Sequence, residues 1–98
     1  MTQLEMVKRA LRITAAVFDD ELSALIEAAL DDLEIAGVAA RDNPDKPLIA
    51  RAVTTYCKAH FGESDDYDRL KESYDEQKSQ LMTAFGYAER EVVDEKVR

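Results

Sequence analysis

The sequence has few of the residues on which covalent cross-links and zinc sites depend. It contains one cysteine, Cys57, and one histidine, His60, among 98 residues. A lone cysteine cannot form an internal disulfide, and a chain without a Cys/His cluster lacks the ligands of a usual zinc site. We therefore expect a protein that folds in a reducing cytoplasm and needs no metal or other cofactor.

Glycine and proline are also scarce, with three glycines and two prolines in the whole chain. Because these residues end helices and build turns, their scarcity favours an all-helical chain. The hydrophobic fraction of 46% is ordinary for a globular protein, and the length suits one small domain. No apolar run approaches the length of a membrane span, and Glu5, Lys8 and Arg9 interrupt the region where a signal peptide would lie. We expect no membrane association.

Basic residues are too few for a protein that wraps nucleic acid. The chain has 13 lysines and arginines against 21 aspartates and glutamates, which gives a net charge of −8. Binding to phosphates needs a basic face. The negative charge is instead consistent with a basic partner, or with a surface that repels DNA.

Apolar residues recur at helical spacing in four segments, at about 2–12, 19–36, 47–61 and 65–85. The connection between the last two is short, so they should form an antiparallel helical hairpin that holds most of the large side chains. We predict an all-α bundle of four helices with this hairpin, 47–86, as its core. Residues 1–86 would form the single domain, and residues 87–98 a flexible C-terminal tail that becomes ordered on assembly.

Local signals set the expected helix boundaries. Thr2 and Glu5 have the spacing of a capping box, and Asp19 is suited to cap the second helix. Gly37 should end that helix, and Pro47 fits the first position of the third. The loop 38–46 is expected to be polar.

The apolar residues of each predicted helix should face the core, and so should those of the connector before the second helix. In the connector these are Ile13, Val17 and Phe18. In the second helix they are Leu22, Leu25, Ile26, Ala29, Leu33 and Ala36. In the third they are Leu48, Ile49, Ala52, Val53, Tyr56, Cys57, His60 and Phe61, and in the fourth Tyr67, Leu70, Tyr74, Gln77, Leu81 and Phe85.

Four acidic residues share the opposite face of the second predicted helix: Asp20, Glu27, Asp31 and Glu34. Like charges at this spacing repel one another weakly, and a solvated face is the simplest interpretation. The functional alternatives are a surface for a basic partner or a neighbouring subunit, and a surface turned toward passing DNA. A di-metal carboxylate site is disfavoured, because such sites in bundles use Glu-x-x-His pairs.

Cys57 and His60 lie three residues apart on one helical face, which suggests a thiolate–imidazole pair. Nucleophilic catalysis would also need an oxyanion hole and a group that orients the base, and neither is visible. Tyr67, Tyr74 and Phe85 keep helical register with Leu70 and Leu81, so packing explains them better than a platform for nucleic-acid bases. The chain has no P-loop or GxGxxG motif, and we do not expect an enzyme.

Taken in order, several stretches resemble one family of tailed bacteriophages. The stretches are LRI (11–13), DDELSALIEAAL (19–30), PLIARAVTTYCKAHFG (47–62), DDYDRLKESYDEQKSQL (65–81) and Gly86-Tyr87. The family is that of the head–tail connector proteins, also called adaptor, head-completion or DNA-packaging proteins. The resemblance covers roughly residues 4 to 87 and carries no catalytic motif.

The resemblance implies an all-α, non-catalytic subunit of an oligomeric ring, usually of twelve copies, in the virion at the head–tail junction. The ring would sit under the portal protein, extend the DNA channel without binding DNA specifically, and support the next head-completion, stopper or tail protein. The C-terminal segment would reach the portal through Tyr87, Glu91, Val92, Val93 and Val97. The alternative from another class is a small acidic regulatory protein that binds a basic partner.

Overall fold

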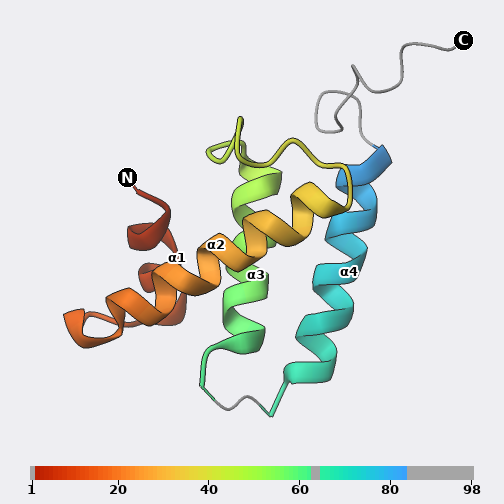
Figure 1. Cartoon of the computed structure of the whole chain (residues 1–98). Coiled ribbons are helices and arrows are strands. Elements are labelled where there is room, and N and C mark those ends of the chain that lie inside the picture. Colours follow the sequence, from red (N-terminus) through yellow and green to blue (C-terminus); the bar gives the residue numbers. More distant parts are fainter. Residues whose placement is uncertain (1, 63–64, 84–98) are drawn as a thin grey trace, which may run out of the picture.

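The computed structural model describes residues 2–62 and 65–83. Within these ranges the chain forms four α-helices and one 3-10 helix, and no β-strand (Figure 1). The elements are α1 (Gln3–Leu11), η1 (Ala16–Phe18), α2 (Asp19–Ile35), α3 (Pro47–His60) and α4 (Tyr67–Thr83). The predicted all-α class with four helices is confirmed.

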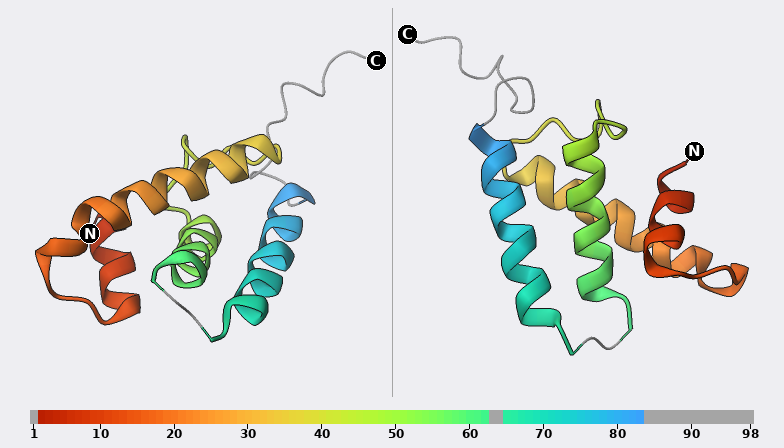
Figure 2. Two further views of the ribbon diagram at one scale, coloured as in Figure 1. Left: turned by 60° about the horizontal axis from the view of Figure 1, so that its bottom comes forward. Right: turned by 180° about the vertical axis from the view of Figure 1, so that it is seen from behind.

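The third helix lies at the centre of the domain. It packs against α1, α2 and α4, and its most extensive contact is with α4, its partner in the helical hairpin. Figure 2 shows α1 and α4 on opposite sides of α3, with α2 crossing over one face. The hairpin is therefore the framework on which the two N-terminal helices pack.

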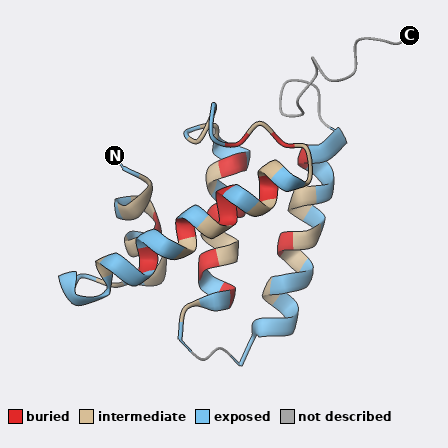
Figure 3. Cartoon of the chain, viewed as in Figure 1, coloured by how far each residue is buried: buried red, intermediate tan, exposed pale blue. Residues whose placement is uncertain are grey.

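All four helices contribute to one hydrophobic core (Figure 3). Its largest fully buried side chains are Val7, Leu22, Leu33, Val38, Ile49, Val53, Cys57 and Leu81. Burial of a side chain of this size contributes about 1.5–3 kcal/mol relative to exposure. Val38 and Ala40 are also fully buried. The expectation of a wholly polar loop after α2 was therefore wrong, because this loop closes one end of the core.

The capping box predicted at the start of α1 is present. The backbone N–H of Glu5 donates to the Thr2 hydroxyl at 3.1 Å, and the N–H of Thr2 donates to the Glu5 carboxylate at 2.9 Å. Two of the backbone donors that a helix leaves unpaired at its N-terminus are thereby satisfied. The helix ends at Leu11, and its C-cap residue Arg12 has a left-handed backbone with a φ of 62°.

The start of α2 differs from the prediction. Phe18 is the N-cap residue, and Asp19 is the first residue of the helix. Instead of capping, the Asp19 carboxylate accepts a hydrogen bond from Lys8 Nζ at 2.7 Å and so ties α2 to α1. Val17 is 79% exposed, and Phe18 is also exposed but packs edge-on against Phe61. Of the connector residues expected to be covered, Ile13 packs against the core.

The hairpin helices also depart from expectation at three positions. Leu48 and Tyr67 are each more than a third exposed, and His60 is exposed at the end of α3. The fourth helix begins at Tyr67, slightly later than predicted, and Asp66 contributes its carbonyl to the first turn by accepting from the Leu70 N–H at 2.8 Å. Phe85, expected in the core, lies outside the described residues.

The end of α2 confirms the role predicted for Gly37. This residue has a φ of +94°, and its N–H donates to the Glu34 carbonyl at 3.0 Å. The N–H of Val38 donates to the Leu33 carbonyl at 2.9 Å. These two bonds form a Schellman motif, in which the left-handed residue is usually glycine. The motif turns the chain so that Val38 enters the core.

Gly37→Ala should therefore destabilise the protein by about 1 kcal/mol, because an alanine there must adopt a left-handed backbone. Apart from the residue itself and its two chain neighbours, no atom lies within 4 Å of the position that the new Cβ would occupy, so the loss of stability comes from backbone strain and not from a clash. Urea unfolding followed by circular dichroism would check it. Gly37→Asn is the matched control and should lose less, since asparagine tolerates this conformation better. An equal stability for Gly37→Ala and the unmodified protein would contradict the assignment.

Candidate functional site

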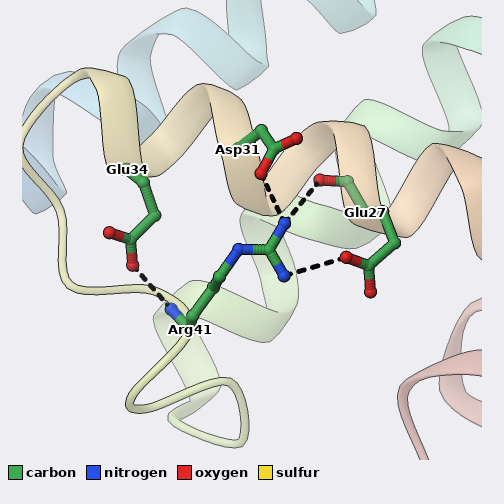
Figure 4. A network of polar contacts seen from close by, with 4 residues as sticks. All are labelled: Glu27, Asp31, Glu34 and Arg41. Atoms are coloured by element: carbon green, nitrogen blue, oxygen red, sulfur yellow. Dashed lines mark hydrogen bonds and ion pairs between the residues drawn. The ribbon is translucent and has the colours of Figure 1, made fainter.

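The acidic face predicted on α2 is real but not uniform. Glu27, Asp31 and Glu34 lie around one cation, Arg41, which comes from the loop after the helix (Figure 4). Asp20 lies about two turns before Glu27, near the start of the helix and away from this group. The structure thus brings together three of the four residues predicted for the acidic face.

Arg41 contacts all three carboxylates through different atoms. Its Nη1 donates to Glu27 Oε1 at 2.8 Å, and its Nη2 donates to the Asp31 carboxylate and to the Glu27 carbonyl. Its backbone N–H donates to Glu34 Oε2 at 2.9 Å. The loop is thereby fastened along the exposed side of α2.

Arg41 and the carboxylates of Glu27, Asp31 and Glu34, here called the Arg41 cluster, form a negative and solvated group. Hydrogen bonds to Asp31 and then to Glu27 raise the pKa of Arg41, so the guanidinium stays charged. The side chains of Glu27 and Asp31 are both well exposed, and exposed pairs of this kind add little to stability. One cation among three carboxylates leaves an excess of negative charge. The cluster therefore acts by orienting the carboxylates and not by removing the acidic surface.

Arg41 was not predicted from the sequence as part of the site. It lies in an irregular loop, where no periodicity indicates which way a side chain points. One signal was available: Arg41 is the only basic residue between Arg12 and Lys46. A single cation placed after a strongly acidic helix could have been tested as its partner.

Asp32 was also not predicted as a site residue, and it links α2 to α4. Its Oδ2 accepts from the Tyr74 hydroxyl at 2.6 Å and from Lys78 Nζ at 3.0 Å. Burial by itself would raise the pKa of this carboxyl, but the two hydrogen bonds outweigh burial and lower the pKa below its usual value. Burial, and then the bond to Asp32, raise the pKa of Tyr74.

Cys57 and His60 do not form a catalytic pair. Cys57 is fully buried, and burial raises the pKa of its thiol to about 12. The thiolate, which is the nucleophilic form, is therefore absent at neutral pH. The exposed ring of His60 lies against Tyr56 at 4.3 Å and Tyr67 at 5.5 Å between ring centres. Both residues serve packing, although His60 does so at the surface.

The described residues give no support to a metal site, because no three His, Cys, Asp or Glu side chains among them are placed to hold one ion. In the same part of the chain, no helix combines the length and apolar character needed to cross a membrane. The tail residues assigned to portal contact lie outside the described ranges. Their role stays a prediction.

Asp32→Asn should lower stability by about 1 kcal/mol at neutral pH, a modest value for hydrogen bonds to a charged group because the carboxylate is partly exposed. The native pKa is lowered from 3.8, so the stabilisation is fully present above that value and is lost as the pH falls through the native pKa. Urea unfolding at several pH values between 7 and 3 would measure it. The stabilities of the two proteins should converge at acidic pH.

Asp75→Asn provides the control for that series. Asp75 forms an exposed ion pair with Lys71 on one helix, at 3.0 Å, and links no two elements. Its removal should have little effect at any pH. A difference between Asp32→Asn and the unmodified protein that does not change with pH would contradict the role given to the Asp32 carboxylate.

Comparison with known proteins places this arrangement in a family. A family model described as phage connector protein matches residues 3–88, which include all four helices and the Arg41 loop. No curated protein and no solved structure matches the chain. The resemblance found in the sequence is thereby confirmed. Since the match spans nearly the whole chain, the protein belongs to the phage connector protein family, whose members are structural components and not enzymes.

Proposed function

We propose that this protein is one subunit of an oligomeric ring of about twelve copies at the head–tail junction of a tailed-phage virion. The ring lies under the portal protein, extends the DNA channel and supports head completion and tail attachment. The observation that carries the proposal is the connector-family match over residues 3–88.

The acidic face of α2 is proposed to line the channel through Asp20, Glu27, Asp31 and Glu34. Arg41 fixes the direction of three of these carboxylates and leaves the surface negative. A negative wall repels phosphates, so DNA passes without being held. DNA could then pass close to the channel wall with little resistance.

The tail is proposed to contact the portal through Tyr87, Glu91, Val92, Val93 and Val97. Valines beside an exposed helical domain gain stability when a partner covers them, and a terminal segment can become ordered on assembly. The family match ends at residue 88, so most of this segment lies beyond the part that the family shares. The opposite side of the ring would receive the next head-completion, stopper or tail protein.

Mass measurement in solution tests the ring. We expect a large closed oligomer, formed either by the protein alone at high concentration or beside portal rings. A chain that ends at Gly86 is the matched variant: it should keep its helical circular dichroism signal and lose portal binding. A stable monomer that binds no portal ring would overturn the proposal and favour a small acidic regulatory protein with a basic partner.

The channel assignment is tested by combining Glu27→Gln, Asp31→Asn and Glu34→Gln in assembled virions. Without these carboxylates the wall repels phosphates less, so DNA release should slow several-fold at low salt, where screening is weakest. Arg41→Gln is the control, because it removes the cation and keeps the repelling charges, and release should not slow. Unchanged assembly, release and infectivity in the triple variant would reject the channel role of this face.

A further inference from the structure

A groove runs between α1 and α3, and it is unusual for its charge. Met6 and Ala10 line it from α1, and Ala50 and Thr54 line it from α3. These residues of α3 lie beside the core-facing residues Ile49 and Val53, at the edge of the buried face, and both are partly exposed. The floor is formed largely by small side chains, so a helix can approach it closely.

Three exposed cations stand along this groove: Arg9, Arg51 and Lys58. None of the ion pairs between described residues involves them, although the whole chain carries a net charge of −8. Asp45 is the one acidic residue among the groove lining. A basic groove on an acidic protein is suited to bind an acidic partner.

The outer side of α4 carries the complementary surface. Asp68, Glu72 and Glu76 are exposed and recur every four residues, so they form one acidic stripe along the helix. The stripe lies opposite Tyr74 and Leu81, which face the core. Like charges at this spacing repel one another. The described cations of α4 are bound to other acids, in the pairs Arg69–Asp66, Lys71–Asp75 and Lys78–Asp32.

We propose that the basic groove of one subunit binds the acidic stripe of α4 of the next copy, so that copies join head to tail. This proposal rests on the ring proposed above and names the interface that closes it. The two surfaces match in length, because Asp68 and Glu76 are about 12 Å apart along their helix and Arg51 and Lys58 about 10.5 Å along theirs. A helix laid in the groove between two others is ordinary helix packing.

The position of the two surfaces explains why the contact repeats. The third helix separates α1 from α4, so the groove and the stripe lie on different sides of one subunit (Figure 2). A subunit that uses its stripe still has its groove free. Such a heterologous contact produces a ring when the rotation between copies closes. The opposite charges fix the register of the contact and speed association.

The test uses two charge-reversed proteins that complement each other. The first carries Glu72→Lys and Glu76→Lys, so both its stripe and its groove are basic. The second carries Arg51→Glu and Lys58→Glu, so both its surfaces are acidic. Each alone should assemble at least about tenfold less well than the unmodified protein at low salt, because like charges then meet at every contact. An equal mixture should assemble again, with the two proteins alternating around an even-numbered ring.

Assembly is measured as mass in solution, alone and beside portal rings, with circular dichroism to confirm that each variant is folded. Glu21→Lys with Asp42→Lys is the matched control, since it reverses two exposed acidic residues elsewhere and should leave assembly unchanged. The single changes Glu76→Lys and Lys58→Glu repeat the test if a double variant fails to fold. The proposed interface is wrong if either charge-reversed protein assembles normally. It is also wrong if the mixture fails to assemble while the unmodified protein forms rings. In both cases the proposal of a ring is retained. An unmodified protein that never assembles overturns both the interface and the ring.

Discussion

The burial of α3 against the three other helices is the constraint on which the structure depends. Ile49, Val53 and Cys57 are fully covered, and each lies on the side of α3 that the other helices close. In a chain of this size one core supplies most of the stability. Shortening any of these side chains would leave a cavity that three elements share, and the surrounding helices could relax into it only in part. The opposite side of α3 carries the exposed residues Arg51 and Lys58, which the proposed subunit interface uses.

The elements that depend on local or periodic signals could be predicted from the sequence. The capping box at Thr2, the left-handed turn at Gly37 and the apolar stripes of α2 and α3 all follow from spacing and residue type. Val17, Leu48 and His60 were placed inside and lie at the surface. Spacing shows which side of a helix a residue lies on, but not how far the neighbouring element extends to cover it. Coverage is a tertiary property.

The polar part of the candidate site was harder to predict than the core. The acidic face of α2 was found from its pattern, but Arg41 and Asp32 were not, because their partners lie in a loop and on another helix. Helical periodicity relates residues of one helix only, so it does not predict a charged contact with a loop or with another helix. These two residues nevertheless fix the surroundings of α2. Asp32 holds α2 against α4, and Arg41 holds the following loop along the exposed side of α2.

The burial of Cys57 has a consequence for life outside the host cell. A virion leaves a reducing cytoplasm for an oxidising medium, where a surface thiol would be converted to a sulfenic acid or would cross-link neighbouring copies. The thiol of Cys57 is covered on all sides and stays protonated at neutral pH. Oxidants therefore cannot reach the Cys57 thiol, and the reactive thiolate form is not present. In the proposed ring, the single sulfhydryl of each subunit would therefore be protected from oxidation.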